Sequence, residues 1–257
     1  MKGAWRRWQA AARGDLVLSW REARGGIIIG AVLFFAASLR CQAGAGGGER
    51  LTLSAYFCDV FAGSLPFAQS GGAPFTLPAA WFALVFFCVH SCALFPARLL
   101  RGMGTARLMR ARSRLRWWWR MMSLSVFWSV VYLVLGVACM AAAGFVCTGA
   151  LPKADIQAGQ FWLVFLTLCV LSSMQAACSA LLSPFAGQAA LILLLVCSAF
   201  WDSPLLWPRY AMLRRGTSEQ GGFPAVFAAA YLIVSFLAVF VLGARLFQKR
   251  DIVSPRS

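Results

Sequence analysis

The chain has 257 residues, of which 61% are hydrophobic and only 12% are charged, and its mean hydropathy is +0.73. A soluble domain carries about 25% charged residues, so this composition excludes an ordinary soluble protein and indicates a polytopic membrane protein. The net charge of +16 is also typical of nucleic-acid binding. The basic residues lie at the edges of apolar segments, however, where membrane topology explains them. We therefore expect an all-α membrane protein with no nucleic-acid partner.

Residues 1–24 are predicted to form an amphipathic interfacial helix. Apolar positions that include Trp5, Trp8 and Trp20 recur at steps of three or four residues, which places them on one helix face. Arginines occupy the other positions, and a helix with Trp on one side and Arg on the other lies flat among lipid headgroups. The three tryptophans are therefore candidate interfacial anchors. The alternative is a tail that charge alone holds at the membrane.

Six apolar stretches are long enough to be candidates for crossing a hydrocarbon core about 30 Å thick. They cover residues 25–43, 77–97, 121–147, 160–182, 186–201 and 225–246. The first is the weakest, because Arg24 and Arg40 flank its short uncharged run and must snorkel to the two interfaces. It also resembles the apolar part of a signal peptide. The long head that precedes it, with Asp15 and Glu22, favours a permanent span.

The segment 51–67 is apolar apart from Asp59. A seventh span here would place the arginine-rich loop that follows the next span on the outer side, against the positive-inside rule. We therefore expect an outer helix that is either re-entrant or merely interfacial. Cys41 and Cys58 are both expected on this side, where a disulfide between them is one alternative.

The loop 98–120 carries eight arginines and no acid. Short loops rich in Lys and Arg stay in the cytoplasm, so this loop orients the whole chain. With six spans, eighteen basic residues fall on its side of the membrane and six on the other. Both termini are therefore expected in the cytoplasm.

The loop between the last two spans, which includes residues 202–224, is too long for a turn and too apolar for a free loop. A short helix that dips into the outer leaflet would fit its composition. Four residues in and beside this loop are candidates for an outer gate. They are Trp201, Asp202, Trp207 and Met212.

Catalytic signatures are missing from the sequence. Between the snorkelling ends, the predicted spans contain no Asp, Glu, Lys or Arg, the groups that ion-coupled transporters usually place at mid-membrane. His90 is the only histidine, which excludes an H-E-x-x-H metal site, and no G-x-x-x-x-G-K-[ST] phosphate loop is present. We therefore expect no catalytic, cofactor or metal site, and we do not expect this chain to be an enzyme.

Together, the amphipathic N-terminal helix, the six spans, the cytoplasmic loop between spans two and three and the apolar outer hairpin form a specific layout. This layout resembles the membrane subunit of an ABC exporter of the type-2 permease family. Two local strings add to the resemblance, namely residues 112–118, which enter span three, and residues 247–252, which follow span six. Both are similar to strings in small permeases found beside bacterial peptide-export ATPases.

The resemblance implies a coupling helix at residues of about 100–116 that docks into the ATPase. The implied coupling residues are Met103, Arg107, Leu108, Arg110 and Arg114. In a helix from Met103 the three arginines share a face with Met103, while Leu108 lies on another face. The simpler alternative is that these arginines only fix topology and bind anionic lipid.

The resemblance also implies partners and a function. Two permeases would pair, as a homodimer or a heterodimer, and each would bind an ATPase subunit that holds the ATP and Mg²⁺. The outer hairpin would cap the exit. We expect a multi-pass protein of the bacterial cytoplasmic membrane that exports a hydrophobic or amphipathic peptide or lipid, for bacteriocin export or for self-protection. The alternatives are a membrane scaffold or sensor without transport activity and an enzyme that lacks a recognisable motif.

Overall fold

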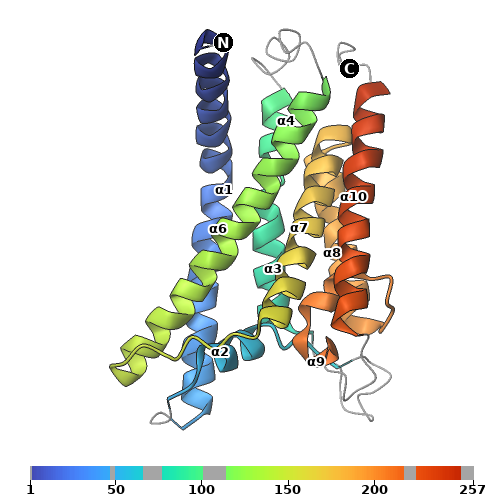
Figure 1. Cartoon of the computed structure of the whole chain (residues 1–257). Coiled ribbons are helices and arrows are strands. Elements are labelled where there is room, and N and C mark those ends of the chain that lie inside the picture. The colour runs from blue at the N-terminus through green and yellow to red at the C-terminus, as the bar shows by residue number, and fades with distance from the viewer. Residues whose placement is uncertain (1, 47–49, 66–76, 101–113, 217–223, 250–257) are drawn as a thin grey trace.

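The computed structural model describes residues 2–46, 50–65, 77–100, 114–216 and 224–249, with side chains from residue 13 onward (Figure 1). These residues form helices and contain no strand, which confirms the predicted all-α fold. Five helical segments among them are long and apolar enough to cross a membrane. The protein is therefore a multi-pass helical membrane protein by length and composition.

The five long segments match five of the six predicted spans. They are α1 (Lys2–Gly44), the pair α3 (Ala79–Ser91) and α4 (Phe95–Leu100), α6 (Arg114–Thr148), α7 (Ala158–Leu181) and α10 (Ala225–Lys249). The predicted fifth span is also a helix, α8 (Pro184–Phe200), but it has only 17 residues. At 1.5 Å per residue it is about 26 Å long, slightly shorter than a hydrocarbon core of about 30 Å.

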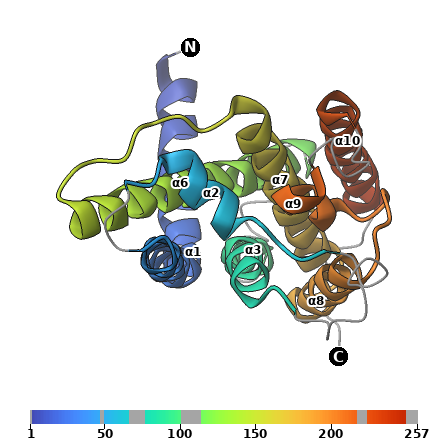
Figure 2. The ribbon, with the colours of Figure 1, turned by 90° about the horizontal axis from the view of Figure 1, so that it is seen from below.

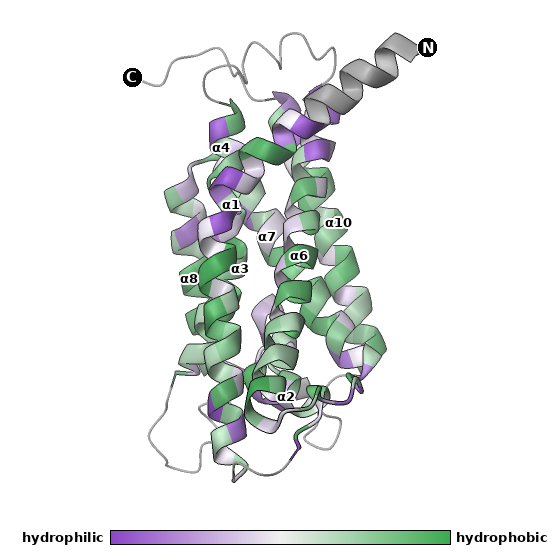
Figure 3. Cartoon of the chain, turned by 90° about the vertical axis from the view of Figure 1, so that its left-hand side faces the viewer, coloured by the Kyte–Doolittle hydropathy of each residue, from purple (hydrophilic) through white to green (hydrophobic). Residues whose placement is uncertain are grey.

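The two ends of the bundle differ in architecture. At one end, α1 and α6 begin, α4 and α10 end, and the chain turns from α7 into α8 (Figure 1). We call this the arginine-rich end, because Arg98, Arg114 and Arg120 lie there. At the other end, α2 (Leu53–Val60), the 3₁₀ helix η2 (Trp207–Ala211) and α9 (Leu213–Gly216) lie across the helix termini (Figure 2). We call it the capped end. Hydrophobic residues dominate the length of the bundle between the two ends (Figure 3).

The first helix is continuous, whereas a separate interfacial helix over 1–24 and a span over 25–43 were expected. α1 runs from Lys2 to Gly44 without a break at residue 24. Glycines lower helix propensity by about 1 kcal/mol each but do not remove a backbone hydrogen bond, so they do not end the helix. Gly26 is also needed for packing, because a Cβ there would lie 2.3 Å from the Oγ of Ser91 in α3. That residues 1–24 lie at the interface stays a prediction.

A reciprocal arrangement of glycines and aromatic rings joins α1 to α6. A Cβ on Gly30 of α1 would lie 2.2 Å from the ring of Tyr132, and a Cβ on Gly136 of α6 would lie 2.6 Å from the ring of Phe34. Each glycine lies four residues from the aromatic residue on its own helix, so the two rings insert side by side along one seam. The buried hydroxyl of Tyr132 donates to the carbonyl of Leu84 (2.8 Å), which ties α3 to the same seam.

The second crossing is interrupted, whereas a single span over 77–97 was expected. Residues 92–94 separate α3 from α4, and the N–H groups of Cys92 and Ala93 bond to carbonyls only three residues earlier, at 3.0 and 2.9 Å. Pro96 explains the interruption, since it has no N–H and its ring clashes with the carbonyl four residues before it. The predicted span at 77–97 therefore corresponds to a pair of helices, which together are long and apolar enough to cross a membrane.

The centre of the bundle is α7, which contacts α3, α4, α6, α8, α10 and η2. Its inward face carries buried small polar side chains, which allow neighbouring helices to approach closely. One of them, Ser172, shares a hydrogen bond with Ser129 of α6 (3.0 Å between the hydroxyl oxygens). By contrast, α10 lies at the edge of the bundle and is the least buried of the long helices.

Candidate functional site

Two carboxylates of α1 hold the described flanks of the predicted coupling loop at the arginine-rich end. Glu22 pairs with Arg98 of α4, and Asp15 pairs with Arg120 of α6 (3.7 Å from Nη1 to Oδ2). The two acids are seven residues apart, so they lie on one helix face two turns from each other. The side chain of Glu22 is only 6% exposed. The two acids of α1 therefore join α1 to α4 and to α6.

The start of α6 is also held to α10. Arg114 donates to the carbonyl of Gln248 (2.8 Å), and the indole N–H of Trp118 donates to the carbonyl of Phe240 (3.0 Å). The ring of Trp117 stacks on Phe247 with 4.8 Å between the centroids. The helix begins at Arg114, seven residues before the predicted start of span three, so the end of the arginine loop is an extension of this span.

Of the predicted coupling residues, the structure therefore places Arg114, against α10. The other four lie in the segment 101–113, outside the described residues; they are Met103, Arg107, Leu108 and Arg110. The predicted shared face of this segment stays a prediction. Arg116, the next arginine of α6, is exposed at the same end and also makes contacts.

Among the predicted interfacial anchors, Trp20 is the one whose side chain the structure describes, and this side chain contacts another helix of the bundle. Its ring stacks on Trp128 of α6 with 5.5 Å between the centroids, while 45% of the residue remains exposed. A partly exposed indole at a helix–helix contact is compatible with an interfacial position. Trp5 and Trp8 lie on α1, but their side chains are outside the described part of the chain.

At the capped end, α2 is tied to the connection between α6 and α7. The carboxylate of Asp155 accepts from the N–H of Ser54 (2.9 Å), and the carbonyl of Lys153 accepts from the N–H of Leu53 (3.0 Å). Thr52 provides the N-cap. The first turn of α2 therefore has its backbone donors satisfied by protein groups. The helix lies at the end where an outer helix was expected, although re-entry into the bilayer stays a prediction.

The four predicted gate residues have different environments. Met212 is fully buried, and it packs on Gly63, where an added Cβ would lie 2.5 Å from the Met212 Cγ. Trp207 is half-buried, and its indole N–H donates to the hydroxyl of Ser235 in α10 (3.0 Å). Trp201 is 65% exposed and points outward from the end of α8. These three residues therefore differ in burial, and their role as an outer gate stays a prediction.

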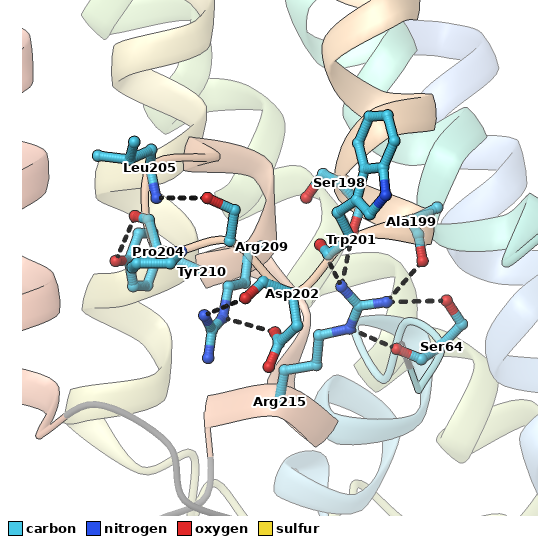
Figure 4. Close-up of polar contacts among 11 residues, drawn as sticks. Ser64, Ser198, Ala199, Trp201, Asp202, Pro204, Leu205, Arg209, Tyr210 and Arg215 are labelled. Carbon is cyan, nitrogen blue, oxygen red and sulfur yellow. Dashed lines mark hydrogen bonds and ion pairs between the residues drawn. The ribbon is translucent and has the colours of Figure 1, made fainter. Parts of the chain in front are cut away.

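Asp202, the fourth predicted gate residue, pairs with Arg209, a residue that the sequence did not single out. The Nε of Arg209 lies 3.1 Å from the Oδ1 of Asp202, and its Nη1 donates to the backbone carbonyl of the same residue (3.3 Å). Arg209 is only 6% exposed. The hydroxyl of Tyr210 donates to the carbonyl of Pro204 (2.8 Å), and burial raises the pKa of this phenol. The outer loop is therefore folded back on itself (Figure 4).

Arg215 is the second cation that sequence reasoning missed. It is 5% exposed, and its guanidinium contacts the end of α8 and the segment after α2 (Figure 4). It donates to the carbonyls of Ser198 (2.6 Å), Ala199 (2.7 Å) and Trp201 (3.4 Å), and to the carbonyl (2.6 Å) and hydroxyl (3.4 Å) of Ser64. Burial lowers its pKa, since desolvation disfavours the charged form. The sequence signal was a basic residue on the sparsely charged outer side.

These contacts explain how α8 ends. The last carbonyls of a helix lack intrahelical donors, and inside a bilayer an unsatisfied carbonyl is costly. Arg215 supplies the missing donors, and its charge is favourable at the negative end of the helix dipole. A helix of 17 residues can therefore end within the protein, with the outer loop above it.

The cysteines and the single histidine complete the predicted candidates. Cys41 and Cys58 are both free thiols, and the Sγ of Cys58 lies 3.4 Å from the Oε1 of Gln160. His90 stacks on Phe86 within α3. Among the described residues, no group of three or more His, Cys, Asp or Glu side chains is arranged to hold a metal ion.

The apolar helices and the absence of charge along most of their length define the class of the protein, a multi-pass helical membrane protein. Within that class, the chain belongs to the DUF2705 family, described as proteins of unknown function, whose model matches residues 52–253. No curated protein sequence and no solved structure shows a significant match to the chain. The family match covers the helices from α2 to α10 and leaves the whole of α1 outside.

Proposed function

We propose that this chain is the membrane subunit of an ABC exporter of the type-2 permease kind. It moves a hydrophobic or amphipathic substrate, a peptide or a lipid-like molecule, across a bacterial cytoplasmic membrane. ATP and Mg²⁺ bind to a separate ATPase subunit, and this chain has no catalytic role of its own. Two permease subunits pair in the complete exporter, and membrane lipid surrounds them.

The observation that carries this proposal is the bonding around the segment 101–113. Its described flanks are α4 and α6, and both are held to α1 by Glu22 and Asp15. Arg114 and Trp118 hold α6 to α10 as well. A partner that binds the arginines of this segment would therefore pull on four helices, α1, α4, α6 and α10. Such bonding supports a role in which force from an ATPase reaches the spans.

The capped end supports an exit gate. Trp207 and Met212 contribute apolar side chains within the outer loop, and Asp202 pairs with Arg209 there. In the exporter, Trp201, Asp202, Trp207 and Met212 form the gate through which the substrate leaves. The arginine-rich end and both termini face the cytoplasm, as the distribution of basic residues favours.

The test exchanges charges at one end of the bundle while keeping their number constant. In one variant Arg107 and Arg110 are both changed to Glu; in the matched control Arg245 and Lys249, exposed at the end of α10, are changed to Glu. The full-length protein is co-expressed with an ABC ATPase and purified in mild detergent, and ATP hydrolysis and complex formation are measured. We expect binding to fall at least about tenfold in the first variant alone, since charge pairs govern recognition across such interfaces.

The control also guards against a change of orientation, because both variants remove the same positive charge from the same side of the membrane. If the Arg107 and Arg110 variant binds and stimulates the ATPase as well as the control does, the coupling assignment is wrong.

A membrane scaffold or sensor is the second candidate function. The exposed arginine-rich end suits a scaffold as well as a coupling surface. The two functions differ in the purified complex, because a scaffold would not change the rate of ATP hydrolysis by its partner. An ATPase whose turnover does not respond to the chain, or the lack of any ATPase in the complex, would favour the scaffold.

A further inference from the structure

At the capped end, two units beside η2 are hydrogen-bonded to one side chain, that of Arg215. The first unit is α2 with the residues that follow it and α9; the N–H groups of Leu213 and Arg214 donate to the carbonyls of Phe61 (2.8 Å) and Ala62 (3.2 Å). The second unit is the end of α8. Within the described part of the chain, every hydrogen bond between residues 61–64 and the end of α8 runs through the guanidinium of Arg215.

The chemistry of this contact permits release. The acceptors of Arg215 are backbone carbonyls and a hydroxyl, all of them neutral (Figure 4). When a buried ion pair separates, one charge is left behind in a medium of low dielectric, which is strongly unfavourable. When Arg215 separates, the carbonyls that remain can be hydrated and no charge is stranded. Arg209 differs in this respect, since it is paired with the carboxylate of Asp202.

The buried cation also lies next to an exposed residue in the chain. Its neighbour Arg214 is exposed to solvent, and α9 is only four residues long. Release therefore moves the side chain of Arg215, while the N–H groups of Leu213 and Arg214 keep α9 on the segment that follows α2. In water the charge of Arg215 regains its hydration, which offsets part of the loss of its bonds.

We propose that Arg215 is the latch of the capped end. While its guanidinium is hydrogen-bonded, it holds α2 and α9 against the end of α8 and keeps the bundle closed. When these hydrogen bonds break, the two units can separate. The proposal rests on the exporter function for its role as an exit gate. The latch itself is a property of the fold and can be tested separately.

The experiment measures whether the site beneath the latch becomes accessible. Ala199, which is fully buried and whose carbonyl accepts from Arg215, is changed to Cys in a variant whose nine native cysteines are replaced. Intact cells are treated with a membrane-impermeant maleimide. We expect Arg215→Gln to increase the labelling rate about tenfold or more, since the loss of even one such hydrogen bond shifts an opening equilibrium by that order. Arg214→Gln, the exposed neighbour with the same change of charge, should leave the rate unchanged.

A second reporter separates opening from unfolding. Ala176, fully buried near the end of α7 that turns into α8, is changed to Cys in the same set of variants and should stay unlabelled throughout. Arg215→Lys keeps the charge but offers fewer donors, so it should fold and label at an intermediate rate. The latch is overturned by an unchanged labelling rate at Ala199→Cys in Arg215→Gln. It is equally overturned by labelling of Ala176→Cys in that variant, or by a lysine variant as slow as the parent.

A separate comparison of labelling rates tests the link between the latch and export. With Arg215 intact, labelling at Ala199→Cys should be faster in cells that hydrolyse ATP than in cells depleted of energy. Acceleration by Arg215→Gln without any effect of energy would support the latch and count against the exporter function. Acceleration by energy without an effect of Arg215→Gln would support a gate at this end and reject Arg215 as its latch.

Discussion

The two ends of the bundle are held by different kinds of bond. At the arginine-rich end, long charged side chains cross from one helix to another, as in the Glu22–Arg98 and Asp15–Arg120 pairs. At the capped end, backbone groups pair directly, and two arginines are nearly fully buried. Ion pairs with a partner exposed to water are weakened by salt, whereas buried backbone bonds respond little to salt. The arginine-rich end is therefore the more easily remodelled, and the capped end the more precisely fitted.

The largest effect is expected from a glycine of the capped end. Gly63 has φ of +70°, and a Cβ there would lie 2.5 Å from Met212. Gly63→Ala combines a left-handed conformation, which costs about 1–2 kcal/mol, with overpacking, which costs about 1–3 kcal/mol. The free energy of unfolding should therefore fall by roughly 2–5 kcal/mol, measured by thermal or denaturant unfolding in detergent.

Gly149 provides the control for this substitution. It has φ of +68°, but nothing lies within 4 Å of an added Cβ. Gly149→Ala should therefore show only the conformational cost of about 1–2 kcal/mol. If the two variants lose the same stability, the fit of Met212 on Gly63 contributes nothing to the capped end.

An intermediate effect is expected at the arginine-rich end, and it should be asymmetric. Glu22 is 6% exposed but its partner Arg98 is 60% exposed. Arg98→Gln leaves a carboxylate unpaired in a buried position, whereas Glu22→Gln leaves a cation that can turn to solvent. We expect Arg98→Gln to cost about 1–3 kcal/mol and Glu22→Gln less than about 1 kcal/mol.

A double-mutant cycle sharpens this prediction. The variant with both changes should recover most of the stability lost in Arg98→Gln, because the stranded charge is gone. The coupling energy should also shrink as salt is raised to 1 M, where the screening length is about 3 Å. Equal losses in the two single variants, or a coupling that salt does not change, would show that the two ends are held alike.

The sequence predicted the long helices well, because uncharged apolar runs have few alternative structures. Spans expected at 160–182 and 225–246 correspond to α7 (Ala158–Leu181) and α10 (Ala225–Lys249). The interruption before Pro96 was visible in the sequence but was not used. The continuity of α1 was missed because its glycines and arginines suggested a boundary, while their effects on a helix are small.

The candidate site was predicted less well, since its bonds join residues far apart in the chain. The sequence located the outer loop and indicated Trp207 and Met212, but its only signal for Arg209 and Arg215 was that they are basic residues on a sparsely charged side. A basic residue in a loop is ordinarily exposed. The burial of Arg215 becomes apparent only in the structure, where the end of α8 and Ser64 lie beside it. Ser64 is 151 positions away from Arg215 in the sequence.

The smallest effect is expected where the outer loop meets α10, at the hydrogen bond from Trp207 to Ser235 (3.0 Å). Ser235→Ala leaves the indole N–H of a half-buried ring unpaired, so we expect a loss of about 1 kcal/mol. Trp207→Phe removes the donor but keeps most of the apolar area, and adding Ser235→Ala to it should cost little more. Hydrogen exchange should increase in η2 and stay unchanged at the start of α6, because no described contact of this pair reaches the arginine-rich end. If exchange increases at both ends, the ends are coupled through α10, and the separation of a fitted end from a remodelled end fails.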